Sequence, residues 1–79
     1  MRFSLFVEQK LREKSGFRLS TASDIEKLVH DIESETREHV GVNTVKRLLG
    51  YLPDEREPRV GTLDVIARYL GFDTWKQLQ

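Results

Sequence analysis

The sequence predicts an all-α fold, a small bundle of four or five short helices. Three observations support this prediction: apolar side chains recur at helical spacing in separate stretches, no stretch alternates apolar and polar residues over a useful length, and glycines close most of the helical stretches. The chain has 79 residues, so its core is small and leaves little room for a deep substrate cleft. We therefore expect one helical domain over residues 1–79.

The first stretch, residues 1–16, is predicted to form an amphipathic helix. Its apolar side chains share helical spacing, with charged residues between them. Gly16 follows and can adopt the left-handed backbone that ends a helix. The residues expected on the buried face are Phe3, Phe6, Val7 and Leu11.

A second helix is predicted from an apolar stripe formed by Ile25, Leu28, Val29 and Ile32. Two signals mark its start. One is Ser20 as a capping residue, and the other is the capping-box pattern Ser23-x-x-Glu26. Both starts remain open, so the boundary is defined only to about three residues.

The third helix is expected at 42–50, after a turn at 36–41 in which the periodicity is lost. Its apolar side chains fall on one face, as Val45, Leu48, Leu49 and Leu52. The opposite face carries the polar residues Asn43, Lys46 and Arg47, together with Gly50.

The C-terminal helices are expected at 62–79, after a polar loop at 53–59 bracketed by two prolines. Thr62 is predicted to cap the first of them, and Gly71 to end it. Its core stripe comprises Leu63, Ile66, Ala67 and Leu70. Asp73 then caps a terminal turn that contains Trp75 and Leu78.

Composition excludes several classes of protein. The chain has no Cys, which removes disulfides, thiolate metal sites and thiol nucleophiles. Its longest apolar run is far below the about 18 residues of a membrane helix, so we expect a soluble cytoplasmic protein with no membrane partner.

The charges are balanced in total but not along the chain. Lys+Arg and Asp+Glu number 13 each, whereas residues 1–19 carry a net +3, 20–38 a net −4, 39–51 a net +2 and 52–79 a net −1. The two positive segments are therefore the candidates for a surface that faces a polyanion.

No enzyme, cofactor, metal site or small-molecule substrate is expected. His30 and His39 lie nine residues apart on different elements, so a shared metal site requires a third ligand by coincidence. The glycines are spaced as helix stops rather than as a phosphate-binding loop. The carboxylates of the second helix are expected on its outer face rather than in a catalytic pair, and they are Asp24, Asp31, Glu35 and Glu38.

The polar face of the third helix is the strongest functional signal. An amide, an ammonium and a guanidinium within two turns are the groups that bond base edges and phosphates in the major groove of DNA. The alternative is an ordinary solvated helix face.

Residues 40–50, followed by Pro58 and residues 62–72, resemble the phage-repressor (Cro/cI-like) helix-turn-helix domain. A wider set of segments resembles uncharacterised Bacteroidetes proteins that begin with such a domain, namely Leu19-Ser20, 24–28, 44–48, Gly50-Tyr51 and Pro58-Arg59 through Trp75. The resemblance covers about residues 19 to 78 and implies a helix-turn-helix unit at 20–50.

Carried over to this chain, the resemblance makes residues 21–37 the first helix of the unit and 42–50 the recognition helix. Val40 becomes the hydrophobic turn residue and Gly41 the N-cap. The chain departs from the family at Gly41, where Ser is usual, and in the longer connection between the two helices.

The resemblance implies a transcription regulator that binds double-stranded DNA, usually as a homodimer. It assigns the base-reading residues as Val42, Asn43 and Lys46. It assigns the residues on the DNA backbone as Thr44, Arg47, Tyr51 and Arg59.

Each assignment has a structural alternative. In these alternatives, Val42 would pack into the turn and Thr44 would bond within its own helix. Tyr51 would be half-buried core, and Arg59 would pair with Glu55 or Glu57. The alternative function is a protein–protein interaction or structural module on the same fold without DNA binding. One further set is expected to pack in the core or, in a dimer or a longer protein, to form an interface: Phe3, Phe6, Phe17, Trp75 and Leu78.

Overall fold

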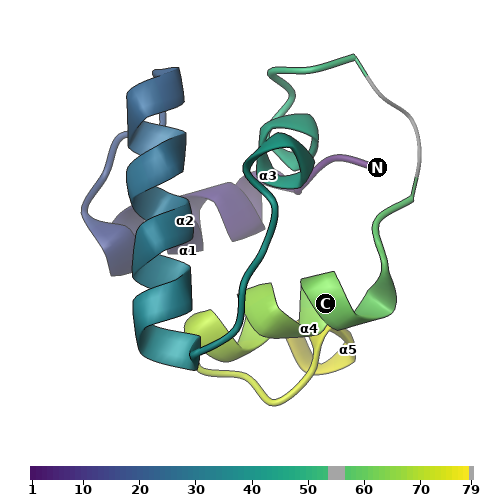
Figure 1. The fold of residues 1–79 in the computed structure, drawn as a ribbon. Coiled ribbons are helices and arrows are strands. Elements are labelled where there is room, and N and C mark those ends of the chain that lie inside the picture. Colours follow the sequence, from purple (N-terminus) through teal and green to yellow (C-terminus); the bar gives the residue numbers. More distant parts are fainter. Residues whose placement is uncertain (54–56, 79) are drawn as a thin grey trace.

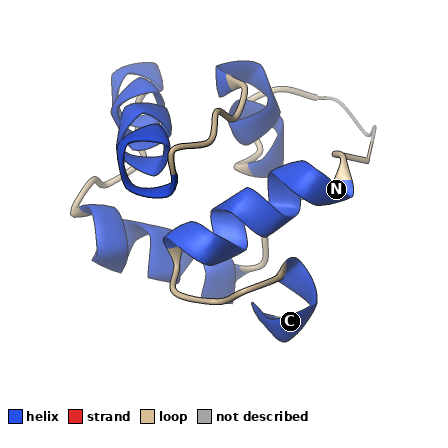
Figure 2. Ribbon diagram, turned by 60° about the horizontal axis from the view of Figure 1, so that its bottom comes forward, coloured by secondary structure: helices blue, strands red, loops and turns tan. Residues whose placement is uncertain are grey.

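The all-α prediction is confirmed by a computed structural model that describes residues 1–53 and 57–78. Within these residues the chain forms a small bundle of helices and no strand (Figures 1 and 2). The helices are α1 (Leu5–Ser15), α2 (Ala22–Thr36), α3 (Val42–Leu48), α4 (Val60–Tyr69) and α5 (Trp75–Leu78). No helix in this part of the chain is both long and apolar enough to cross a membrane.

α2 and α4 each pack against two other helices. α2 contacts both α3 and α4, and α4 also contacts α5. In Figure 1, α1 crosses behind α2, while α3 and α4 lie to the same side of it. The buried apolar side chains form one cluster to which every helix contributes. Its most completely buried members include Leu11, Ile25, Leu28, Ile32, Val45, Leu48 and Ile66.

α1 ends where the sequence predicts, because Gly16 adopts the left-handed conformation with φ of 80°. The prediction for Phe6 is wrong, since 55% of this residue is exposed. Phe3 precedes the N-cap Ser4, so the helical spacing counted from Phe3 does not apply. Val7 and Leu11 fill the buried face, and the Phe6 ring lies outside, 4.9 Å from Lys10 Nζ.

α2 begins after Thr21, between the two predicted starts. Thr21 Oγ1 accepts the Asp24 N–H at 3.2 Å, and Asp24 Oδ2 accepts the Ser20 N–H at 3.4 Å. These reciprocal bonds satisfy amides at the helix start as a capping box does. Ser23 lies inside the first turn instead, so the pattern Ser23-x-x-Glu26 does not mark the boundary.

Two other predicted boundaries need correction. The third helix ends at Leu48 rather than at residue 50, because Gly50 is left-handed with φ of 86°. α4 begins at Val60 with Arg59 as N-cap. Thr62 therefore does not cap it. The Thr62 N–H already donates to the Arg59 carbonyl at 3.0 Å, which places Thr62 inside the first turn.

The last turn is capped one residue later than predicted. Thr74 Oγ1 accepts the Gln77 N–H at 3.3 Å, and Gln77 Oε1 accepts the Asp73 N–H at 2.9 Å. Asp64 of α4 also accepts the Trp75 N–H at 2.9 Å. This bond fixes α5 on α4, so a four-residue helix forms that has no stability of its own.

A polar cluster joins α1, α2 and α4. The Tyr69 hydroxyl donates to Asp31 Oδ2 at 2.5 Å, so Asp31 does not lie on the outer face of α2 as predicted. Lys14 Nζ lies 5.5 Å from the Tyr69 ring and 2.8 Å from Glu35 Oε1. Burial and the bond to Asp31 raise the pKa of Tyr69, and the bond to Glu35 raises the pKa of Lys14.

We predict that Thr21→Ala lowers the free energy of unfolding by about 1 kcal/mol, because it removes the side-chain cap of α2. The matched variant Ser23→Ala should change it by less than about 0.5 kcal/mol, since Ala suits a helix interior. Urea unfolding followed by circular dichroism measures both. Equal losses in the two variants would contradict the assignment of the cap.

Tyr69→Phe is expected to lower the free energy of unfolding by about 1–2 kcal/mol near neutral pH, because it removes a buried hydrogen bond. The pKa of Tyr69 is higher in the folded than in the unfolded chain. The hydrogen bond to Asp31 therefore makes its full contribution to the free energy of unfolding below about pH 10, and this contribution declines at higher pH. The difference in the free energy of unfolding between wild type and variant should therefore become smaller in urea titrations above pH 10. A constant difference up to pH 11.5 would refute this linkage.

Candidate functional site

The predicted site residues of α3 form two neighbouring stripes along the helix. Asn43 is exposed and Lys46 is half-buried, and their spacing of three residues puts them on one stripe. Thr44 and Arg47 form the adjacent stripe, and both are half-buried. Val42 is partly buried against the core, which agrees with its structural alternative while leaving part of its side chain accessible.

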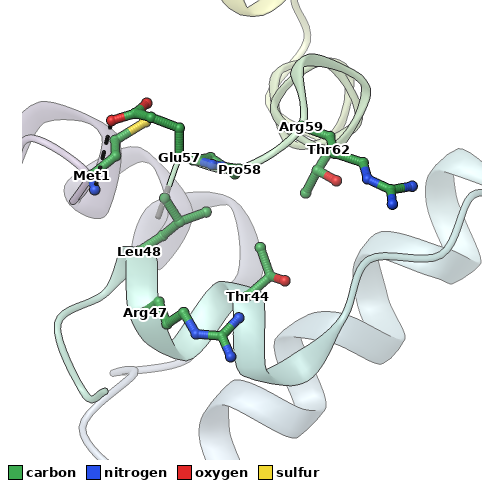
Figure 3. A pocket seen from close by; sticks show the side chains of 8 residues that line it. All are labelled: Met1, Thr44, Arg47, Leu48, Glu57, Pro58, Arg59 and Thr62. Atoms are coloured by element: carbon green, nitrogen blue, oxygen red, sulfur yellow. Dashed lines mark ion pairs between the residues drawn. The ribbon is translucent and has the colours of Figure 1, made fainter. Parts of the chain in front are cut away.

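The second stripe of α3 lines a hollow that it shares with the start of α4. The hollow has a volume of about 360 Å³ and is lined by Met1, Thr44, Arg47, Leu48, Glu57, Pro58, Arg59 and Thr62. Figure 3 shows the guanidinium groups of Arg47 and Arg59 extending to the same side of it. Thr44 of α3 and Thr62 of α4 lie between the two elements in the same view, and Met1 and Glu57 lie at the opposite end.

A second hollow of about 490 Å³ adjoins the first, because both are lined by Arg59 and Thr62. Its other lining residues are Glu38, His39, Gly61 and Val65. The two hollows together follow the first turn of α4, from α3 to the connection between α2 and α3. Sequence reasoning missed Thr62 and His39 as lining residues. The spacing Arg59-x-x-Thr62, one helical turn, was the available signal for Thr62.

Arg59 is placed by its backbone at the start of α4. It is the N-cap of α4, with an extended backbone, and its side chain is exposed. Glu57, one predicted partner, has its carboxylate 3.9 Å from the amino group of Met1. Glu55, the other predicted partner, lies outside the described residues, as do Asp54 and Arg56 of the same loop.

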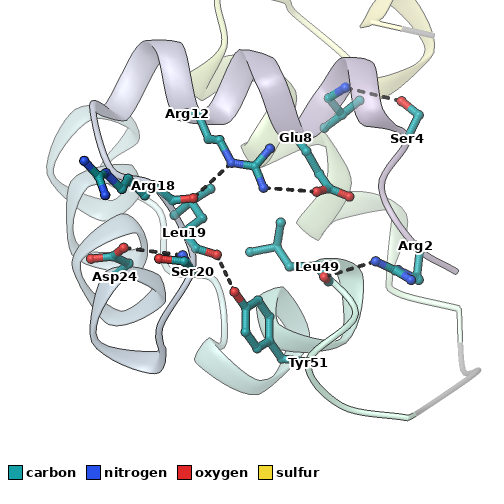
Figure 4. A network of polar contacts seen from close by, with 11 residues as sticks. Arg2, Ser4, Glu8, Arg12, Arg18, Leu19, Ser20, Asp24, Leu49 and Tyr51 are labelled. Atoms are coloured by element: carbon teal, nitrogen blue, oxygen red, sulfur yellow. Dashed lines mark hydrogen bonds and ion pairs between the residues drawn. The ribbon is translucent and has the colours of Figure 1, made fainter.

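Tyr51 is occupied within the fold. Its hydroxyl donates to the Leu19 carbonyl at 2.5 Å, although 45% of the residue is exposed (Figure 4). This bond connects the end of α3 to the loop between α1 and α2. Tyr51 therefore does not belong to the buried core, and its hydroxyl proton is engaged in the bond to Leu19.

Two cations of the positive N-terminal segment, Arg12 and Lys14, form ion pairs within the fold. Arg12 contacts Glu8 at 3.3 Å and donates to the Arg18 carbonyl at 2.9 Å. Lys14 pairs with Glu35 of α2. These contacts use Arg12 and Lys14 within the fold.

Most of the aromatic and apolar set from the two ends of the chain packs in the core. Phe3, Trp75 and Leu78 are buried and Phe17 is partly buried, so core packing accounts for four of its five members. Phe6 is the exception, and the neighbouring Leu5 is 80% exposed. Beside them, between the start of α1 and α5, lies an apolar hollow of about 560 Å³ lined by Met1, Arg2, Ser4, Phe6, Val7, Trp75 and Leu78.

Among the described residues, no three His, Cys, Asp or Glu side chains group closely enough to hold a metal ion. His39 Nδ1 lies 3.9 Å from Glu33 Oε1, and both side chains are exposed. Compared with known protein families, with curated proteins and with solved structures, the chain shows no match to any of them.

Tyr51→Phe should lower the free energy of unfolding by about 1 kcal/mol, because it removes the hydroxyl that bonds the Leu19 carbonyl and keeps the ring. Chemical unfolding measures the loss. The amide signals of residues 19 and 20 should shift in the nuclear magnetic resonance spectrum of the variant. A variant as stable as the wild type, with unshifted signals, would show that this bond is absent in solution.

Proposed function

We propose that the protein binds double-stranded DNA as a transcription regulator, with α3 in the major groove. One observation carries the proposal. The polar stripes of α3 adjoin a hollow where two guanidinium groups and two hydroxyls, from α3 and from the first turn of α4, extend toward one side. Such donors hold phosphates, while a helix of this diameter fits the major groove and presents side chains to base edges.

The two stripes of α3 contact different parts of the DNA in this proposal. Asn43 and Lys46 read base edges, since an amide bonds adenine and an ammonium bonds guanine. The accessible part of Val42 contacts a thymine methyl group. Thr44 and Arg47 contact the DNA backbone from the hollow.

Two residues of α4 complete the contacts to phosphate. Arg59 supplies a guanidinium and Thr62 a hydroxyl at the positive end of the helix dipole, where an anion is favoured. We assign Tyr51 to holding α3, because a bond from its hydroxyl to a phosphate requires loss of the bond to Leu19.

The resemblance to the phage-repressor helix-turn-helix, and to Bacteroidetes proteins with that domain, belongs to the same proposal. It is supported by Val40, which is 2% exposed between α2 and α3, and by Gly41, which begins α3. We further propose a twofold homodimer acting in the cytoplasm, because a single module makes too few phosphate contacts for useful affinity at physiological salt. We also propose a binding role rather than an enzymatic one, because Glu33, Glu35 and Glu38 are exposed side chains rather than members of a catalytic pair.

A protein-interaction module is the second candidate function. It is favoured by Leu5 and Phe6, which are exposed beside the apolar hollow between α1 and α5. The cations paired with Glu8, Glu35 and Glu38 also reduce the charge available to DNA.

Fluorescence anisotropy against labelled random duplexes at 50 mM and 200 mM salt tests the proposal. We expect binding at the lower salt and a loss of roughly 150-fold in affinity at the higher salt, because Arg47 and Arg59 of the two chains of a dimer would neutralise about four phosphates. Lys46→Ala with Arg47→Ala should weaken binding at least about tenfold, because it removes one base contact and one phosphate contact. The matched control Arg18→Ala with Lys27→Ala removes the same charge from exposed positions and should have little effect.

Retained affinity in the folded Lys46→Ala, Arg47→Ala variant would reject α3 as the recognition helix. Failure of the folded wild-type protein to bind at 50 mM salt would reject DNA binding altogether and favour the interaction module. The stoichiometry of the same titration tests the dimer, since one protein chain per duplex site would exclude it.

A further inference from the structure

The C-terminal end of α3 has a donor for each carbonyl from Val45 to Leu49. α3 has seven residues, too few to be stable by itself, and the last turn of any helix leaves carbonyls without partners. Three of the donors are local. The N–H groups of Leu49, Gly50 and Tyr51 bond the carbonyls of Val45, Arg47 and Lys46 at 2.9, 3.1 and 2.8 Å. The last two bonds form a Schellman motif around the left-handed Gly50.

The other two donors come from the start of the chain. The Phe3 N–H bonds the Leu48 carbonyl at 2.8 Å, and Arg2 Nη2 bonds the Leu49 carbonyl at 3.4 Å (Figure 4). The guanidinium of Arg2 lies against Gly50 so closely that a Cβ at this position would stand 2.4 Å from Arg2 Cζ. The positive φ favours glycine there, and any larger residue would displace the Arg2 guanidinium from its place.

The segment that provides these donors is itself fixed. Phe3 is buried, and its ring centroid lies 5.8 Å from that of Trp75 in α5. The opposite end of α3 is less constrained, because its N-cap Gly41 has no side chain to bond the first amides. The orientation of α3 therefore depends mainly on what holds its C-terminal end.

We propose that Arg2 is a positioning residue for α3. Together with the Phe3 amide it holds the helix in the orientation in which Asn43 and Lys46 read bases, and it contacts no base itself. This inference rests on the proposed function. It also adds a part of the chain that the helix-turn-helix resemblance, which starts at about residue 19, does not include.

Arg2→Met tests the inference, because it keeps the aliphatic stem and removes the donor. Arg18→Met is the charge-matched control, since Arg18 is exposed on the loop before α2. Arg2→Lys serves as the rescue, because its ammonium can donate to the Leu49 carbonyl. The first readout is the ratio of affinities for a duplex selected by the wild-type protein and for random duplexes. We expect this ratio to fall roughly fivefold in Arg2→Met and to recover in part in Arg2→Lys.

The second readout needs no DNA. The amide signals of residues 43–51 should shift, and their hydrogen exchange should accelerate about fivefold, in Arg2→Met and not in Arg18→Met. If the wild-type protein binds no DNA, the proposed function fails while this readout still decides whether Arg2 holds α3. A merely stabilising role would lower the unfolding midpoint and leave the affinity ratio unchanged. An unchanged ratio, or unchanged α3 signals and exchange in folded Arg2→Met, overturns the proposal.

Discussion

Attachment of α3 through its apolar face and its C-terminal end is the constraint on which the structure depends. A helix of seven residues gains too little from its own hydrogen bonds to offset the entropy of ordering it. Its apolar face, with Val45 and Leu48, is buried in the core, and its last carbonyls are bonded by the Schellman turn and by the start of the chain. Tyr51 adds a link to the loop before α2. The helix proposed to read DNA is thus ordered by tertiary contacts.

The charges of the chain serve two different purposes. Glu35 and Glu38 of the α2 region bond Lys14 and Arg68, which connects α2 to α1 and α4. Such exposed pairs contribute little free energy each. The guanidinium groups of Arg47 and Arg59 extend beside the same hollow. A chain with no net charge can therefore present a local basic surface.

The parts of the fold that sequence could predict are those set by local chemistry. The stripe from Ile25 to Ile32, the stop at Gly16 and the start of α3 after Gly41 follow from periodicity and from glycine geometry. The capping residue of α2 is harder to predict, because Ser20, Thr21 and Ser23 have similar side chains. In the structure it is Thr21 whose hydroxyl accepts the Asp24 N–H. The α3 stripes of the candidate site followed from helical spacing in the same way.

What sequence could not predict is the pairing of residues far apart in the chain. Arg2 bonds a carbonyl 47 residues away, Tyr51 one 32 residues away, and Tyr69 a carboxylate 38 residues away. No local pattern encodes these partners, because they are brought together only by the packing of whole helices. For the same reason Thr62 looked like a cap and proved to line the hollow beside Arg59.

The contact of Phe3 with Trp75 has a consequence for the order of folding during synthesis. The two rings belong to positions 3 and 75, so Phe3 cannot take its final place before Trp75 has been synthesised. α2 and its loop can form earlier, since their contacts are closer in sequence. The bonds from Arg2 and Phe3 to the C-terminal end of α3 are then completed only after α5 has been synthesised.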